Sequence, residues 1–171
     1  MLFSADEFEH YTGVFGDSLA ASHLKSAQEI VENYLHFNLE SKDYITKSIS
    51  TGRAYVRAKA RPITELRSVK INGESLPIED FVFCNEYVYR TAQNFPNSAI
   101  VEMEYTAGFT ADTIPEIIKT TVWQIAALRQ IESGQNIGVS SKSFGDSGSR
   151  VFLSTRKYDD FLINCSKFKF K

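Results

Sequence analysis

The chain has 171 residues, and its 19 lysines and arginines nearly balance its 21 aspartates and glutamates, leaving a formal net charge of -2 at pH 7. With 43% hydrophobic and 23% charged residues, the composition is ordinary for a globular protein and excludes a disordered or fibrous chain. The weak negative charge gives no overall attraction to nucleic acid. A chain of this length usually forms one main core, so we expect a single domain over residues 1–171.

Signals for membrane insertion or export are not found in the sequence. No apolar run approaches the ~18 residues that a membrane span needs, and the N-terminus lacks the basic-then-apolar pattern of a cleaved signal. The two cysteines, Cys84 and Cys165, lie far apart without metal-ligand spacing. Two cysteines without such spacing favour a compartment in which thiols stay reduced. Because no membrane span is predicted, we expect no membrane partner.

The first predicted element follows a short N-terminal stretch and is a helix over residues 19–36. Apolar side chains recur there at spacings of three and four, the period of one helix face. Asp17 or Ser18 is placed to cap its beginning. The face predicted to be buried consists of Leu24, Ala27, Val31 and Leu35.

Residues 44–105 change to short β-branched and aromatic runs broken by turn residues, which indicates a β-rich hairpin insertion. Turns are expected at Thr51-Gly52, Asn72-Gly73 and Asn85-Glu86, and Asn-Gly is the strongest of these signals. The expected strands cover residues 45–49, 53–59, 66–71, 81–84, 87–89 and 99–105. Alternation in the last run predicts three core-facing side chains, Val101, Met103 and Tyr105.

A second long helix is expected after Thr113, in a sequence that matches a capping box. In that motif the Thr113 hydroxyl accepts a hydrogen bond from the Glu116 amide, and the Glu116 carboxylate accepts one from the Thr113 amide. The apolar stripe of this helix begins at Ile118. Gly134 is the expected position of its end.

Residues 135–171 are expected to form an extended segment, a short helix and a C-terminal arm. Residues 135–150 are rich in Ser and Gly and show no periodicity, which predicts an extended or mobile segment. A third helix with Ser154 or Thr155 as its cap follows from the spacing of Tyr158, Phe161, Leu162 and Cys165.

The last five residues, 167–171, alternate strictly between Lys and Phe, the period of a strand. An edge strand would gain about 1.5–3 kcal/mol for each of Phe168 and Phe170 buried against a partner. Completion of the chain's own β lobe and a frayed terminus remain open alternatives.

Residues 145–148 read Gly-Asp-Ser-Gly, the sequence around the nucleophilic serine of chymotrypsin-like proteases. That mechanism needs a histidine base and a buried aspartate, whereas every histidine of the chain precedes or lies in the first helix: His10, His23 and His36. A serine hydrolase using Ser147 is therefore a remote alternative. With no metal-ligand spacing and no phosphate-binding glycine loop, we expect no catalytic residue, no metal and no cofactor.

The order of these elements resembles that of the head-tail connector (adaptor) proteins of tailed bacteriophages. Residues 61–63 leading to residues 69–73 are similar to the first hairpin of that family. The matched stretches span about Ser18 to Leu162, and the Lys/Phe end departs from the pattern because family members end soon after the last helix. Three segments carry the resemblance: residues 27–35 (AQEIVENYL), residues 104–109 (EYTAGF) followed by 114–119 (IPEIIK), and residues 139–145 (VSSKSFG).

The resemblance implies an α+β fold: a small helical bundle, made of two long helices and a short C-terminal helix, with the β-rich insertion between the first two. It implies a non-catalytic subunit that forms a homo-oligomeric ring, a dodecamer, in the virion neck below the portal vertex, after assembly in the host cytoplasm. Its partners would be its own copies, the portal protein, and a head-closure or tail-completion protein. DNA would pass through the lumen without sequence-specific binding, and a mildly acidic subunit suits such a lumen.

A ring needs two different complementary faces per subunit, because its contacts are heterologous. We expect the long helices to form the ring body and residues 135–171 to reach a neighbouring subunit or the portal. A tail-completion or head-closure protein is the alternative, and a β-barrel with little helix would favour it. The candidate contact residues are Ser141, Lys142, Phe144, Arg150, Phe152, Phe168 and Phe170.

Overall fold

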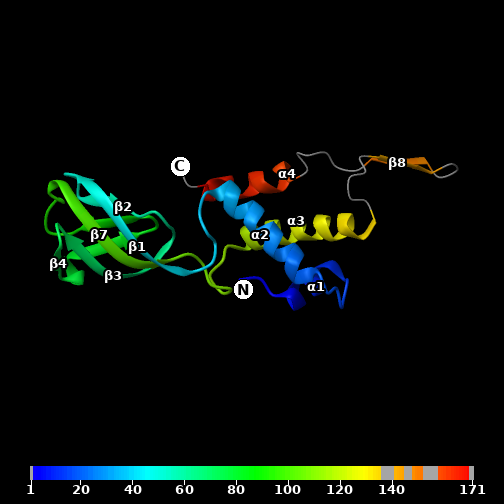
Figure 1. Ribbon diagram of the computed structural model, residues 1–171, viewed down its shortest axis with the longest axis horizontal. Helices are drawn as coiled ribbons and strands as arrows, with labels where there is room; N and C mark the ends of the chain where they lie inside the picture. The colour runs from blue at the N-terminus through cyan, green and yellow to red at the C-terminus, as the bar shows by residue number, and fades with distance from the viewer. Residues whose placement is uncertain (1, 136–140, 145–147, 152–157, 170–171) are drawn as a thin grey trace. The chain divides into compact units, whose positions relative to one another are not determined.

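The computed structural model describes residues 2–135, 141–144, 148–151 and 158–169. The chain divides into two compact units, a helical unit (residues 1–36 and 114–171) and a β unit (residues 37–113) (Figure 1). The fold class is α+β, in agreement with the sequence. None of the helices in the described ranges is long and apolar enough to cross a membrane.

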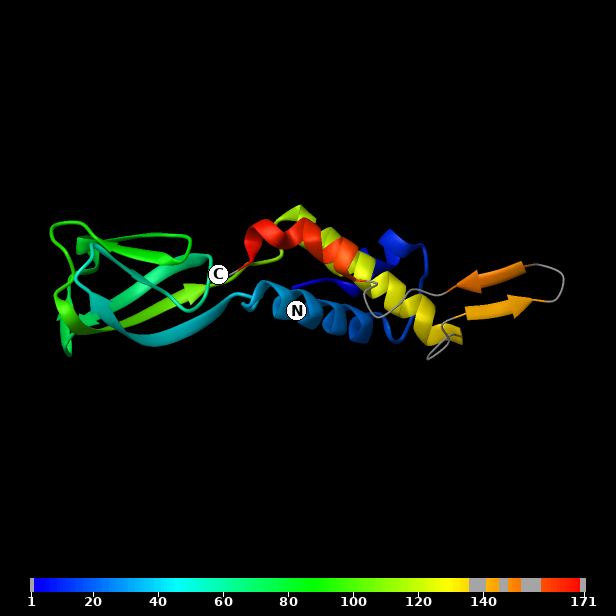
Figure 2. The same cartoon turned by 90° about the horizontal axis from the view of Figure 1, so that it is seen from above.

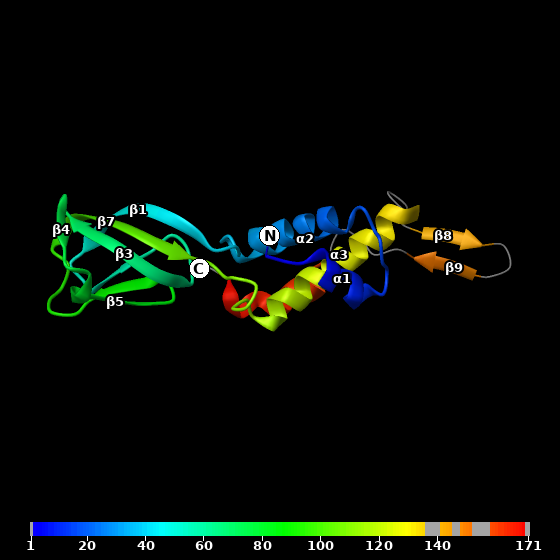
Figure 3. The ribbon, with the colours of Figure 1, turned by 90° about the horizontal axis from the view of Figure 1, so that it is seen from below.

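The helical unit is assembled from segments far apart in the sequence. Figure 2 shows α3 running beside the C-terminal turns α4 and η2, and Figure 3 shows α2 beside α3. Its elements are α1 (Ala5–Thr12), α2 (Ala20–Leu35), α3 (Glu116–Gln135), α4 (Asp159–Leu162), the 3-10 helix η2 (Ile163–Phe168), and a hairpin of β8 (Ser141–Phe144) and β9 (Gly148–Val151).

Helix α2 confirms the prediction for residues 19–36. All four residues of the predicted stripe are fully buried. The predicted cap at Asp17 or Ser18 is wrong, because Leu19 occupies the N-cap position and no side chain caps the helix. The Asp17 carboxylate instead accepts a hydrogen bond from the Leu19 backbone amide (2.9 Å), just before the helix begins. On α3, which packs beside α2, Ile118, Val122 and Ile125 are also fully buried.

Helix α1 was not expected from the sequence. Its backbone ends at Gly13, which adopts a left-handed conformation (φ 71°) and donates its amide to the Glu9 carbonyl. Glycine adopts that conformation without steric cost. Burial of Phe3 and Phe8 fixes this segment to the helical unit, because each large apolar side chain removed from water stabilises the packed state.

The capping-box prediction at Thr113 is wrong. The Thr113 hydroxyl accepts from the Thr110 amide (2.9 Å), on its N-terminal side. The first helical hydrogen bonds of α3 instead run from Ile118 and Lys119 to the Pro115 carbonyl. Pro115 therefore occupies the position that a capping threonine would need.

The strand predicted for residues 167–171 is also wrong where the structure describes it. Lys167 and Phe168 lie in η2, and the Lys169 amide donates to the Ser166 carbonyl. The Lys169 ammonium lies 4.6 Å from the centre of the Tyr34 ring on α2, a cation–π contact that ties the end of the helical turn to its unit. Phe170 and Lys171 lie outside the described residues.

The short C-terminal helix itself is confirmed, and Leu162 and Cys165 on it are buried. Tyr158 stands at the beginning of α4, while Ser154 and Thr155 lie outside the described residues. The preceding segment, expected to be extended or mobile, contains the antiparallel strands β8 and β9.

The β unit contains two antiparallel sheets. In the larger sheet the strand order is β1-β7-β3-β4, and in the smaller sheet it is β2-β6-β5. The short 3-10 helix η1 (Ile78–Asp80) precedes β5. The strands are β1 (Lys42–Thr51), β2 (Tyr55–Arg57), β3 (Ile63–Ile71), β4 (Glu74–Leu76), β5 (Phe81–Cys84), β6 (Tyr87–Arg90) and β7 (Asn97–Ala107).

Two of the three predicted hairpin turns are confirmed. Asn72 and Gly73, both with positive φ (52° and 88°), connect β3 to β4, and Asn85 connects β5 to β6. Thr51-Gly52 does not form a hairpin, because β1 pairs with β7 and β2 pairs with β6. The strand predicted for residues 53–59 is correspondingly shorter, at Tyr55–Arg57.

The core of the β unit includes the three β7 side chains predicted to face it, Val101, Met103 and Tyr105. The Tyr105 hydroxyl accepts from the backbone amides of Lys59 and Ala60 (3.1 and 3.3 Å). Burial raises the pKa of the Tyr105 hydroxyl, so its neutral form is favoured.

Glu86 is a charged residue within this unit and its side chain is 8% exposed. Its carboxylate pairs with the guanidinium groups of Arg57 (2.9 Å) and Arg61 (2.7 Å). Its backbone carbonyl accepts from the Ala58 amide. The segment between β2 and β3 is thereby fastened to the β5–β6 turn.

Candidate interaction surface

The outward-facing side of the larger sheet is the main candidate site, and we call it the outer sheet face. It consists of the side chains of β1, β7 and β3 that point away from the β-unit core. Cross-strand pairing places Lys47 opposite Glu102 and Ile49 opposite Ile100. On the third strand, Lys70 lies opposite Glu102.

Strand β1 directs both of its isoleucines outward. Ile45 and Ile49 are 69% and 72% exposed, whereas Thr46 and Ser50 on the other side are buried. An antiparallel sheet with one solvated face normally shows the reverse, with apolar residues inward and polar residues outward. Exposure to solvent alone therefore does not account for this pattern. A partner that covers the outer sheet face would account for it.

Ile49 and Ile100 lie at one end of the outer sheet face. We call this end, together with the neighbouring Lys47, Glu102 and Lys70, the isoleucine end. Ile100 is 53% exposed. The Lys47 ammonium lies 2.6 Å from the Glu102 carboxylate, and the charge of Lys70 also acts on that carboxylate. The hydrogen bond from Lys47 lowers the pKa of Glu102. Two cations share one anion here, so the isoleucine end is positive by one charge.

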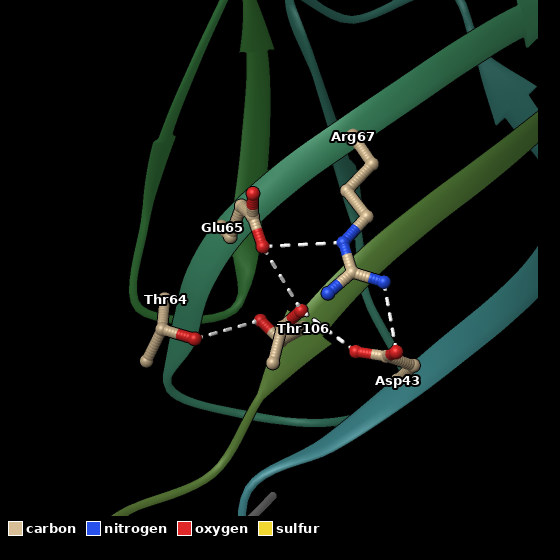
Figure 4. Close-up of polar contacts among 5 residues, drawn as sticks. All are labelled: Asp43, Thr64, Glu65, Arg67 and Thr106. Atoms are coloured by element: carbon tan, nitrogen blue, oxygen red, sulfur yellow. Dashed lines mark hydrogen bonds and ion pairs between the residues drawn. The ribbon is translucent and has the colours of Figure 1, made fainter.

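The opposite end of the face carries a polar network (Figure 4). The Arg67 guanidinium donates to Asp43 (2.7 Å) on β1 and to Glu65 (3.1 Å) on its own strand. The Thr106 hydroxyl on β7 donates to the Asp43 carboxylate (2.8 Å). These contacts lower the pKa of Asp43 and raise that of Arg67, and they join all three strands.

Two irregularities in β3 explain how Glu65 and Arg67 point outward although Ile63 and Val69, which regular alternation would place on the same side, point to the core. The register shifts between Ile63 and Glu65 and again between Leu66 and Ser68. A bulge inserts an extra residue and redirects side chains. The buried positions of this part of the strand are consequently three apart, at Ile63, Leu66 and Val69.

A second exposed apolar surface lies on the helical unit and runs from the last turn of α1 to the beginning of α2, over residues 11–19. We call it the apolar turn. Phe15 is 64% exposed, and its ring makes an edge-on contact with His10 (5.3 Å between centroids). Four large apolar side chains of this segment are exposed: Tyr11, Val14, Phe15 and Leu19.

Contacts with α3 hold the apolar turn in place. The Tyr11 ring packs on Trp123 (5.1 Å), and the Gln130 amide donates to the Asp17 carboxylate (2.6 Å). Lys119 pairs with Glu7 (2.9 Å) while lying over the Trp123 ring. The bond from the Leu19 amide is the largest cause of the lowered pKa of Asp17, followed by that from Gln130.

The candidate contacts chosen from the sequence are distributed over three places. Ser141, Lys142 and Phe144 lie on β8, and Arg150 lies on β9 directly opposite Lys142. Phe168 lies in η2. Phe152 and Phe170 lie outside the described residues. Neither the outer sheet face nor the apolar turn was among these candidates.

The structure provides no support for serine-hydrolase chemistry in the part of the chain that it describes. Ser147 lies outside that part. A different serine, Ser133, has its hydroxyl 3.3 Å from His23 Nε2, but it also donates to the Gln130 carbonyl of its own helix (3.0 Å). That bond is an ordinary serine-to-backbone contact near a helix end. No group of three or more metal-ligating side chains occurs among the described residues.

The α+β fold of this chain is also found in subunits of gene transfer agent particles. A chain from the neck of the native particle, computed with C12 symmetry, matches with a TM-score of 0.61 and 13% identity over 98% of this chain and 88% of that chain. One from the neck of the empty particle, computed with C6 symmetry, matches with a TM-score of 0.57 and 16% identity over 99% and 90%.

A third match, from the virion of the native gene transfer agent particle, has a TM-score of 0.58 and 16% identity over 99% of this chain and 90% of that chain. At these identities the likeness is one of fold, and it extends over both units. No family model matches the sequence, and no curated protein matches it.

Proposed function

We propose that the chain is a non-catalytic structural subunit of the neck of a tailed phage or phage-like particle. The observation that carries this proposal is the fold likeness to neck chains over 98–99% of the sequence. The sequence segments that resemble head-tail connector proteins lie in both units, at residues 27–35, 104–109 and 114–119, and support the same assignment independently.

In this proposal the subunits form a ring, a dodecamer, below the portal vertex. Support comes from the symmetry of the similar neck structures, which were computed with C6 and C12 symmetry. The ring would bind the portal protein on one side and a head-closure or tail-completion protein on the other. DNA would pass through the lumen, and a subunit of net charge -2 would not hold it by dense phosphate contacts.

Within the ring, α2, α3 and the C-terminal turns would form the helical body, with residues 44–105 as its β-rich insertion. The β8–β9 hairpin and residues up to 171 would reach a neighbouring subunit or the portal through Ser141, Lys142, Phe144, Arg150, Phe152, Phe168 and Phe170. A tail-completion or head-closure subunit, usually dominated by a β-barrel, is less well supported because α2 and α3 have 16 and 20 residues.

The test is to mix the purified chain with the portal assembly of the same phage or phage-like particle and to image the mixture by electron microscopy. We expect a ring attached to the portal. A monomer in the absence of portal is compatible with assembly on the portal only. Failure to bind the portal at high concentration would contradict the proposal.

A deletion tests the C-terminal contribution separately. Removal of residues 166–171 should weaken binding to the portal or to neighbouring copies, because it removes Phe168 and Phe170. Trp123 fluorescence, which reports on the helical unit, should confirm that the shortened chain still folds. Unchanged assembly would show that this end of the chain is not a contact.

A further inference from the structure

We propose that, in the ring, the apolar turn of one copy docks on the isoleucine end of the outer sheet face of the next copy. This inference rests on the proposed function, because only a ring of identical subunits requires the contact. The occupant is therefore a second copy of this chain, and the two surfaces are different parts of the same sequence.

The two surfaces match in apolar character. The apolar turn offers four exposed large side chains within nine residues, Tyr11–Leu19, and the isoleucine end offers Ile49 and Ile100 side by side. A single exposed apolar residue is normal on a protein surface, whereas a cluster marks an interaction site.

They also match in charge. Residues 2–19 contain Asp6, Glu7, Glu9 and Asp17 and no lysine or arginine; with the Lys119 that pairs with Glu7, the region has a net charge of about -3 from these groups. The isoleucine end has two lysines around Glu102. Opposite charge at the edges of an apolar contact favours association and fixes its orientation.

The charge distribution also indicates which end of the outer sheet face is used. Glu104 lies opposite Ile45, and the Asp43–Glu65–Arg67 network occupies the far end. Both regions add negative charge, so the positive charge is confined to the isoleucine end. An acidic turn would be repelled from the rest of the face.

A heterologous contact of this kind agrees with the geometry of a closed ring. Each subunit must present two different surfaces, one to each neighbour. The apolar turn belongs to the helical unit and the isoleucine end belongs to the β unit. Every copy thus carries one of each, and a contact between them can repeat around the ring.

The first experiment uses the full chain labelled with ¹³C at the isoleucine δ1 methyl groups, followed by NMR as its concentration is raised. The Ile49 and Ile100 signals should move with concentration, while Ile163, which is exposed on η2, should not. Phe15→Ser should weaken the association on the order of 10-fold or more. Ile131→Ser, a change at an equally exposed position (66%) on α3, is the matched control.

The second experiment mixes two variants, Phe15→Ser and Ile100→Ser, and measures mass by native mass spectrometry. Each variant alone has one of the two surfaces weakened and should associate on the order of 10-fold more weakly than the wild type. Together they retain one intact turn and one intact sheet face, so the mixture should form a heterodimer and nothing larger. Val82→Ser, which alters an equally exposed residue (53%) on β5, should leave wild-type association unchanged.

The outcomes separate this inference from the proposed function. If the wild type self-associates but its Ile49 and Ile100 signals do not move, or if the mixture of the two variants then forms no heterodimer, the docking is overturned. If both variants still form rings on the portal like the wild type, the docking is wrong and the neck function stands. If the wild type binds neither itself nor the portal, both proposals fail together.

Discussion

The two units of the chain are stabilised in different ways. The helical unit joins α1, α2, α3 and the C-terminal turns, which come from opposite ends of the sequence, mainly through apolar side chains. The β unit is one continuous stretch whose strands are also fastened by buried polar contacts at Glu86 and Tyr105. The stability gained from a buried apolar side chain depends on how completely it fills its space. The stability gained from a buried polar contact depends on whether each polar group keeps its partner.

Each unit contains its own reporter group. The single tryptophan, Trp123, and the buried Cys165 lie in the helical unit, whereas Cys84 lies exposed in the β unit. Burial raises the pKa of the Cys165 thiol, which keeps it protonated and slow to react. Trp123 fluorescence and Cys165 alkylation therefore follow the helical unit, and amide exchange of β7 follows the β unit.

The largest effect is expected from a cavity in the helical unit. Ile125→Ala should lower the free energy of unfolding of that unit by about 4 kcal/mol, because Ile125 is fully buried. Urea denaturation followed by Trp123 fluorescence measures the change. Ile131→Ala, at an exposed position of the same helix, should change it by less than about 0.5 kcal/mol. An equal loss in β7 amide protection would show that the two units unfold together.

A somewhat smaller effect is expected from breaking the buried ion pairs of the β unit. Glu86→Ala leaves the Arg57 and Arg61 guanidinium groups without this carboxylate and should cost about 3 kcal/mol. Amide exchange of β7 measures the loss, while Cys165 should stay protected from alkylation. Glu65→Ala, which removes an exposed carboxylate bound to Arg67, is the control and should leave exchange nearly unchanged. Equal effects of the two changes would contradict the role of burial.

Strong local signals in the sequence were sufficient for much of the fold. The regular apolar spacing of α2 and the Asn72-Gly73 turn each specify their structure within a few residues, so both were predictable. Helix α1 was missed although Ser4, Glu7 and Gly13 stand at the positions of helix start and stop signals. Its eight residues are too few for a clear period.

Other features depend on tertiary pairing and leave little local trace. Alternation along β1 gives two sets of side chains, Ile45 with Ile49 and Thr46 with Ser50, and hydrophobicity alone would bury the isoleucines. The structure shows the opposite. Val101, Met103 and Tyr105 of β7 face the core, and pairing with β7 places the isoleucines of β1 on the outer side. The candidate interaction surface could therefore not be recognised from the sequence alone. The same holds for the bulges that turn Glu65 and Arg67 to the outer side, because they appear only in the pairing of β3 with β7.

An intermediate effect is expected at Tyr105. Tyr105→Phe removes the acceptor for the Lys59 and Ala60 amides and should cost the β unit about 2 kcal/mol near neutral pH. Because the folded state raises the pKa of this tyrosine, its contribution is complete below about pH 10 and is lost as the pH rises through the folded pKa. The wild type should therefore lose β7 amide protection in alkali more steeply than the variant. Parallel pH profiles would contradict this assignment.

The smallest effect on stability, but a specific one, is expected on the outer sheet face. Arg67→Ala should return the pKa of Asp43 toward its ordinary value, because the hydrogen bond from Arg67 is the main cause of its lowering. The carboxyl ¹³C signal of Asp43, followed by NMR through an acid titration, measures this change. Lys47→Ala should do the same to Glu102 and leave Asp43 unchanged. If either variant shifts both carboxyl groups, the two ends of the face are electrostatically coupled, and an acidic turn could not distinguish the isoleucine end from the polar end.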